Sequence, residues 1–180
     1  MIALDTNFLV YAHREDSPWH SEAYRCVATL AEGRQPWAVP WCCIHEFLSI
    51  VTHPRIYIPP TPLKVALDQV EAWRESPSLV LLAETEGYWK HLRAAAEGGR
   101  IAGPLVHDAR VAALCIAHGV RELWSADRDF SRFPGLKIRN PLAGESLREY
   151  SGNLQAGTPF AEMKDQAREN AVREKARKKS

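Results

Sequence analysis

The chain of 180 residues is 46% hydrophobic and 25% charged, which is typical of one globular domain with a sizeable core. Its net charge of +1 argues against a strongly basic nucleic-acid binder, although a local basic patch is compatible with it. No apolar run approaches the ~18 residues that span a bilayer, and the start "MIALDTN" lacks the basic flank of a signal peptide. We therefore expect a cytoplasmic protein that makes no contact with a membrane.

Five short apolar runs, each bounded by polar or turn residues, are typical of strands covered on both faces. In chain order they are IAL (2–4), WAVP (37–40), SLVLLA (78–83), ELWSA (122–126) and LKI (136–138). Helical patterns lie between them at 42–51, 61–73, 85–99 and 108–119, the second with Thr61 as its expected cap. Strands that alternate with helices in this way predict an α/β domain with a mostly parallel central sheet flanked by helices.

The end of the chain differs from the rest in charge. Residues 151–180 hold 7 Lys/Arg and 4 Asp/Glu, which gives +3, so the remaining residues carry −2 of the total of +1. This segment is rich in helix formers but has too few apolar positions for a core stripe. We expect one domain over 1–142 and a charged C-terminal extension over 143–180, either a solvated helix or a frayed one.

The cysteines predict no covalent staple or zinc site. They include an adjacent pair and form no C-x-x-C motif. We interpret them as buried reduced thiols rather than as a disulfide framework or a zinc ribbon. They are Cys26, Cys42, Cys43 and Cys115.

Four carboxylates fall where this scaffold could bring side chains together. Asp5 ends the first strand and Asp127 follows the fourth, and the functional crevice of such a sheet lies at the carboxyl ends of its strands. Asp108 starts a helix, where backbone amides favour an anion, and Glu46 lies off the centre of an apolar helix stripe. Two like charges ~4 Å apart repel by roughly 4 kcal/mol at an effective dielectric near 20. Such a cluster must take up protons or bind a cation, and Mg²⁺ prefers oxygen ligands of this kind.

Each acid also has a structural explanation of its own. Asp108 alone would be a helix cap, Asp127 could open a turn, and Glu46 could be a solvated helix residue. Asp5 is the hardest to explain in this way, because a carboxylate that closes an apolar strand is costly unless it is paired or used. The four acids together carry the prediction.

At these residues the sequence resembles the PIN-domain ribonucleases, and within them the VapC toxins of bacterial toxin–antitoxin pairs. The matching stretches run through residues 2–142 in the family's order and spacing. They are ALDTNFLVYA, WCCIHEFLSIVTHPRIY and VHDARVAALCIAHGVRELWSADRDFSRFPGLKIRNPL. The resemblance implies a PIN-like fold in which Asp5 and Asp108 bind the metal directly. It also implies that Glu46 helps shape the metal site and that Asp127 completes it.

Three further polar residues enter through the same resemblance. Asn7 and Ser125 match the positions that commonly accompany the first and fourth acids, and Asp129 is a candidate substitute for Asp127. Serine stands at 125 where threonine is common, a change that keeps the hydroxyl. The segment after Leu142 extends beyond the point where many relatives stop, so the resemblance says nothing of its role.

The activity that the resemblance implies is cleavage of RNA with one or two Mg²⁺ or Mn²⁺ ions. Such an ion lowers the pKa of a bound water and positions it at the phosphate, which would leave a 5′-phosphate and a 3′-hydroxyl. The resemblance also implies a small VapB-type antitoxin as partner, in a homodimer or a toxin–antitoxin hetero-oligomer. Four arginines near the acids could either bind RNA phosphates or be solvated surface residues: Arg14, Arg55, Arg128 and Arg132.

Other functions remain to be weighed against this one. A phosphatase with an aspartyl nucleophile would usually carry a second Asp where Asn7 stands, and a dinucleotide-binding domain would need glycines in "DTNFLV". His45 and Glu46 lack the second histidine of the zinc motif H-E-x-x-H, because position 49 is serine. A processing or repair nuclease, and a catalytically silent PIN fold that binds RNA or protein, stay open as alternatives.

Overall fold

The structure of the protein, a computed structural model, describes residues 1–143. In this part of the chain five strands form one sheet in the order β3-β2-β1-β4-β5, and every neighbouring pair is parallel. The strands are β1 (Ile2–Leu4), β2 (Trp37–Pro40), β3 (Leu79–Leu82), β4 (Glu122–Trp124) and β5 (Ile138–Arg139). This confirms the predicted α/β fold. The helix expected within the C-terminal extension lies outside the described residues.

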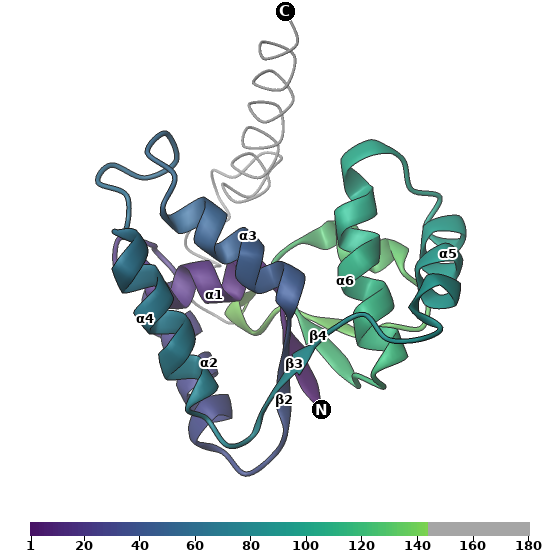
Figure 1. Cartoon of the computed structure of the whole chain (residues 1–180), viewed down its shortest axis with the longest axis horizontal. Coiled ribbons are helices and arrows are strands. Elements are labelled where there is room, and N and C mark those ends of the chain that lie inside the picture. Colours follow the sequence, from purple (N-terminus) through teal and green to yellow (C-terminus); the bar gives the residue numbers. More distant parts are fainter. Residues whose placement is uncertain (144–180) are drawn as a thin grey trace, which may run out of the picture.

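Six α-helices surround the sheet in the described part of the chain. They are α1 (Thr6–His13), α2 (His20–Glu32), α3 (Trp41–Val51), α4 (Leu63–Arg74), α5 (Tyr88–Gly98) and α6 (Val106–Ala117). Figure 1 shows the first four gathered on one side of the sheet and α5 and α6 on the other. Within residues 1–143, no helix combines the length and the apolarity needed to cross a membrane.

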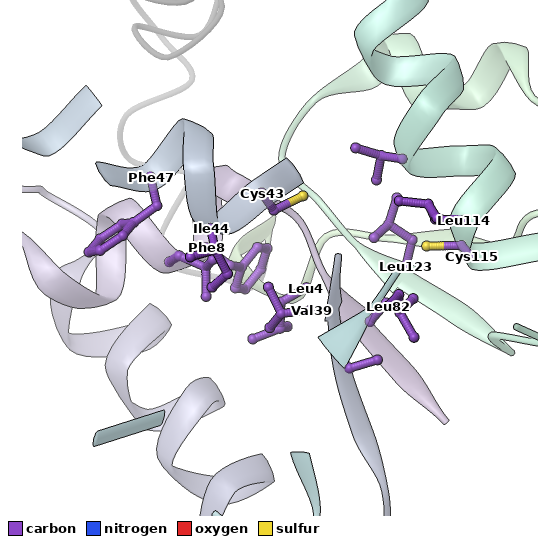
Figure 2. Close-up of a cluster of buried hydrophobic side chains, with 14 of the residues drawn as sticks. Leu4, Phe8, Val39, Cys43, Ile44, Phe47, Leu82, Leu114, Cys115 and Leu123 are labelled. Atoms are coloured by element: carbon purple, nitrogen blue, oxygen red, sulfur yellow. The ribbon is translucent and has the colours of Figure 1, made fainter. Parts of the chain in front are cut away.

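The core lies on both faces of the sheet, as Figure 2 shows. Leu4, Phe8 and Val39 pack under α3 on one side, and Leu114 of α6 packs near Leu123 of β4 on the other. Burial on both faces explains why the three inner strands β2, β1 and β4 are mainly apolar, whereas the edge strands β3 and β5 each expose a residue. All four cysteines are free in the structure, but the prediction that they are buried holds only for Cys43 and Cys115, since Cys26 and Cys42 are half-buried.

The sequence prediction missed the first two helices. Residues 6–12 of α1 are all buried, so this helix has no polar face and no periodic stripe. In α2 only Ala23 and Val27 are buried, but Ala23, Val27 and Leu30 stand at helical spacing and face the core. The stripe of α2 was therefore a usable signal, whereas α1 offered none.

The prediction that Thr61 caps α4 is wrong. The helix begins at Leu63, with Pro62 at the cap position and no side-chain cap hydrogen bond. The hydroxyl of Thr61 instead lies 3.3 Å from Nε2 of His13 and accepts a hydrogen bond from Arg14 at 3.2 Å. A contact with another helix has therefore replaced the local cap, and sequence spacing does not reveal such long-range contacts.

The strand order places the ends of β1 and β4 side by side. The chain moves from β1 to β2 and β3 in one direction, and β4 then pairs with the other edge of β1. The backbone N–H of Asp5 donates to the carbonyl of Trp124 at 3.1 Å, which extends this pairing beyond the strands. Ligands bind α/β sheets at such a switch point, outside the carboxyl ends of the strands.

The buried carboxylate of Glu122 in β4 forms an ion pair with Lys137, the residue directly before β5. Its side chain is 6% exposed, lies 2.7 Å from Nζ of Lys137 and accepts a hydrogen bond from Nε1 of Trp124 at 2.8 Å. The contact with Lys137 holds the pKa of Glu122 below its ordinary value. This stabilisation is therefore complete above the pKa of an unfolded glutamate, about 4.3, and is lost as the pH falls further.

We expect Glu122→Gln to lower the free energy of unfolding by about 1–3 kcal/mol at neutral pH, because charge-assisted hydrogen bonds are lost. Below about pH 4.3 the difference from the wild type should shrink, since protonation removes the same charge from the wild type. Urea denaturation at pH 7 and pH 4 measures both values. A difference that is equal at the two pH values would contradict this account.

Candidate active site

Asp5 is a fully buried carboxylate at the end of β1. Its Oδ2 accepts hydrogen bonds from Nδ2 of Asn7 and from Oγ of Ser125, both at 2.8 Å. The Sγ of Cys43, in the first turn of α3, donates to Oδ1 at 3.9 Å. Burying a charge is costly unless it is hydrogen-bonded, and these donors offset that cost. The donors come from three different elements, so the fold itself fixes the orientation of this carboxylate.

The same network continues into the loop after β4. Nδ2 of Asn7 also donates to Oγ of Ser125 at 3.0 Å, and Oδ1 of Asn7 accepts from the backbone N–H of Ala126 at 3.3 Å. The Ser125 hydroxyl oxygen in turn accepts from the backbone N–H of Asp127 at 3.0 Å. The position of Asp127 is thereby coupled to the start of α1.

Three carboxylates gather beside this network. Asp108, in the first turn of α6, and Asp127 and Asp129, after β4, each offer an oxygen atom within 4.8 Å of the other two. Asp108 is buried and the other two are half-buried. Among the described residues, Asp5 does not belong to this group. Three carboxylate oxygens at such separations are the donor set that Mg²⁺ or Mn²⁺ takes, so the residues fit a hard divalent cation.

The turn after β4 brings Asp127 and Asp129, which are two residues apart, into the same acidic group. Asp127 caps a short 3₁₀ helix (Arg128–Arg132), and its Oδ1 accepts from the backbone N–H of Asp129 at 2.9 Å. Asp127 therefore opens a turn and also belongs to the acidic group. The two explanations weighed from the sequence are compatible, because a capping carboxylate keeps a second oxygen for other contacts.

Glu46 is positioned by a hydrogen bond with Thr6, the residue that follows Asp5. The hydroxyl of Thr6 donates to Oε2 of Glu46 at 2.7 Å, which links α1 to α3. Glu46 is half-buried, on the flank of the face that α3 packs on the core. The sequence did not single out Thr6, although its place in "DTN" next to the first acid was a usable signal.

The phenol of Tyr11 also lies close to the acids. Burial raises the pKa of Tyr11, and the nearby Tyr57 and the negative charges of Asp5 and Asp127 raise it further. The Tyr11 side chain therefore stays protonated at neutral pH. Its neutrality adds no negative charge to a site that already holds several carboxylates.

A model of the PIN domain family matches residues 2–136. The chain belongs to the PIN domain family. Ribonuclease VapC48 of Mycobacterium tuberculosis is 34% identical to it over 140 residues, which cover 78% of this chain and 97% of that protein. These matches confirm the resemblance to PIN-domain ribonucleases and, within them, to VapC proteins.

Solved structures agree with this fold. The structure of VapBC2 from Rickettsia felis, bound to a DNA fragment from its promoter, gives a TM-score of 0.55 at 21% identity, covering 78% of this chain and 98% of that one. VapC20 of Mycobacterium tuberculosis, a Sarcin-Ricin loop cleaving toxin, gives 0.52 at 20% identity, covering 76% of this chain and 99% of its own. At such identities the likeness establishes the PIN fold alone.

The arginines proposed from the sequence as phosphate ligands differ in how this PIN domain uses them. Arg14 donates to the Asp16 carboxylate and to the carbonyl of Pro59, and its guanidinium lies 4.0 Å from the ring centroid of Tyr57. Arg14 therefore holds the loop between α3 and α4 in place. Arg132 pairs with Asp129 at 3.2 Å. Both Arg55 and Arg128 are exposed.

Proposed function

We propose that this chain is a metal-dependent endoribonuclease of the VapC type, with its nuclease unit over residues 1–142. The observation that carries the proposal is the group of Asp108, Asp127 and Asp129, beside the buried Asp5 at the carboxyl edge of the sheet. The VapC relatives at 33–34% identity are named ribonucleases, which supports RNA as the substrate.

Each acid has a part in holding the cation. Asp108 and Asp5 are the proposed ligands, Asp127 and Asp129 complete the site from the loop after β4, and Glu46 shapes it from α3. A bound Mg²⁺ or Mn²⁺ would lower the pKa of a water molecule and offset negative charge that develops on the phosphate.

The uncharged residues act as positioning groups. Asn7 and Ser125 hold the Asp5 carboxylate in one orientation, because both donate to the same carboxylate oxygen. Thr6 does the same for Glu46 with a hydrogen bond of 2.7 Å. An ordered set of carboxylates binds a cation better than a mobile one, because less side-chain freedom is lost on binding.

Removal of the metal tests this function. The purified full chain should cut an end-labelled structured RNA in Mg²⁺ or Mn²⁺ and should stop in excess EDTA, and added Mn²⁺ should restore the cut at the same positions. The physical reason is that the phosphate and the carboxylates repel one another without a cation between them. Equal cleavage in EDTA would refute metal dependence.

We also propose a VapB-type antitoxin as the partner of this chain, and the cytoplasm as its location. The VapC relatives and the likeness to a VapBC2 structure support a toxin–antitoxin pair. An acidic group of this kind can accept an arginine guanidinium through bidentate hydrogen bonds in place of a metal. An antitoxin segment that carries such an arginine would inhibit the enzyme by occupying its cation site.

A further inference from the structure

Arg110 is a cation at the carboxyl edge of the sheet that the proposed chemistry does not use. It lies on α6 two residues after Asp108, and its Nε and Nη2 contact Oε1 of Glu84 at 3.0 and 2.8 Å. Glu84 follows the end of β3. Arg110 therefore stands at the β3 end of the same edge at which the acids lie near β1 and β4.

The strand register places this ion pair near the start of α3. Pro40, the last residue of β2, pairs with Leu82, the last residue of β3, so Trp41 begins α3 where the chain leaves β3 toward Glu84. The helix that carries Arg110, α6, also packs against β2. The order along the edge is then Arg110 beside β3 and β2, followed by Asp5 after β1 and Asp127 after β4.

The pairing of Arg110 with Glu84 is of a kind that a ligand can replace. The Arg110 side chain is 39% exposed and that of Glu84 is 50% exposed. Ion pairs in contact with water contribute little net stability, because solvent screens both charges. A phosphate group offers the guanidinium the same bidentate geometry as a carboxylate. Exchange of Glu84 for an RNA phosphate therefore costs the fold little.

An aromatic pair lies at the start of α3, on the same edge of the sheet. Trp41, the first residue of the helix, is exposed, and its ring centroid lies 6.2 Å from that of His45 at an interplanar angle of 35°. Trp41 follows β2 beside the end of β3, from which Glu84 reaches Arg110, and Cys43, two residues after Trp41, contacts Asp5. Exposed aromatic rings beside a cation are the surface on which single-stranded RNA stacks its bases.

We propose that Arg110 and the Trp41–His45 pair form a subsite for the nucleotide next to the scissile phosphate. Arg110 exchanges Glu84 for a phosphate of that nucleotide, and the ring pair stacks on its base. This inference rests on the proposed function, since it assumes that RNA lies along the edge that holds the acids. The subsite would provide attractive contacts to a phosphate and a base of the RNA. The acidic group does not provide them, because it repels phosphates.

The test uses two substitutions of the same ion pair that should act in opposite directions. Arg110→Gln should lower the affinity for a fluorescein-labelled single-stranded RNA about tenfold and reduce the salt slope of binding by about 1. Glu84→Gln should raise the affinity several-fold, because it frees the guanidinium. Fluorescence anisotropy with the full chain in EDTA measures binding without cleavage. If the pair were only structural, the two substitutions would change stability alike and leave RNA affinity unchanged.

The pair Arg93–Glu97 on α5 provides matched controls. Its two side chains are exposed and lie 2.8 Å apart, so Arg93→Gln and Glu97→Gln make the same changes of charge elsewhere on the surface. We expect both to leave affinity within about twofold of the wild type. Equal effects at the two pairs would mean that RNA responds only to overall charge, and that result would overturn the subsite.

The ring pair is tested in the same assay. Trp41→Ala should lower RNA affinity about tenfold, and Trp41→Phe should keep most of it, because stacking needs an aromatic face. Tyr24→Ala is the control, since Tyr24 forms a similar pair with His20 on α2, at 5.8 Å and 37°. If Trp41→Ala changes the oligomeric state in gel filtration and leaves RNA affinity intact, this surface binds protein and the subsite is wrong.

Failure of the subsite is distinguishable from failure of the proposed function. If the wild type cuts RNA in Mg²⁺ or Mn²⁺ while Arg110→Gln, Glu84→Gln and Trp41→Ala behave as their controls do, only the subsite is wrong. If the wild type neither binds nor cuts RNA with these ions, the proposed function fails and the subsite fails with it.

Discussion

Replacing Asp108 by asparagine is expected to lower RNA cleavage at least about a hundredfold and to leave the fold intact. Asp108 is buried in the first turn of α6 and shares the acidic group with Asp127 and Asp129. An amide removes one negative charge from the cation site, and a loss of ~3 kcal/mol in transition-state stabilisation corresponds to about a hundredfold in rate. The metal-free variant should unfold no earlier than the wild type, because the substitution relieves repulsion among the acids.

Thermal unfolding provides the second readout. Mn²⁺ should raise the unfolding temperature of the wild type, since it binds the folded state, and should not raise that of Asp108→Asn. Asp68→Asn is the control, because Asp68 is an exposed acid on α4 paired with Lys64. It should retain both the cleavage rate and the response to Mn²⁺. If Asp108→Asn keeps wild-type cleavage, the acidic group is not the active site.

The same variant separates toxicity from other effects of expression. Wild-type chain produced without an antitoxin should slow bacterial growth, whereas Asp108→Asn produced at the same level should not. Growth inhibition that persists in the variant would mean that the harm does not come from cleavage at this site.

The largest loss of stability is expected for Asn7→Ala. Asn7 donates to Asp5 and Ser125 and accepts from the backbone of Ala126, all within the buried network. Its removal leaves the Asp5 carboxylate buried with one donor fewer, and breaking a buried polar contact to a charge costs about 3 kcal/mol. Urea denaturation should show this loss as a lower midpoint with an unchanged slope.

A second substitution distinguishes a network around a charge from simple loss of packing. In the double variant Asp5→Asn, Asn7→Ala, the buried charge is gone, so part of the lost stability should return. If the two substitutions are instead additive in their effects on the free energy of unfolding, Asn7 does not act by compensating the charge of Asp5. Ser125→Thr is the conservative control and should keep stability, because it keeps the hydroxyl.

The inner strands β1, β2 and β4 were predictable because both faces of the sheet are covered there, so each appears in the sequence as a short, mainly apolar run. The helix α1 was not predictable, because residues 6–12 are buried on every side and show no stripe. Thr61 was wrongly predicted as a cap for a related reason. Its hydroxyl contacts His13, the last residue of α1, and Arg14 directly after it, both nearly fifty positions away, and local patterns carry no information on such contacts.

For the candidate site, the sequence supplied the acids but not their grouping. Asp129 was only a candidate substitute for Asp127, whereas the 3₁₀ turn brings both into one group with Asp108. The contact of Ser125 with Asp5 joins residues 120 positions apart and depends on the pairing of β1 with β4. That pairing depends on the order of the strands in the sheet. An alternation of strands and helices in the sequence does not determine this order. The partnership of Arg110 with Glu84 was missed for the same reason.

The ends of the RNA products test the central claim most directly. If a cation held by these carboxylates directs water to the phosphate, the 3′ oxygen leaves, and every cut yields a 5′-phosphate and a 3′-hydroxyl. We predict these ends for RNA cut by the wild type in Mn²⁺, and no cut RNA with Asp108→Asn. Fragments that carry a 2′,3′-cyclic phosphate and a 5′-hydroxyl would show that the 2′-hydroxyl of the RNA was the nucleophile, and they would contradict the account.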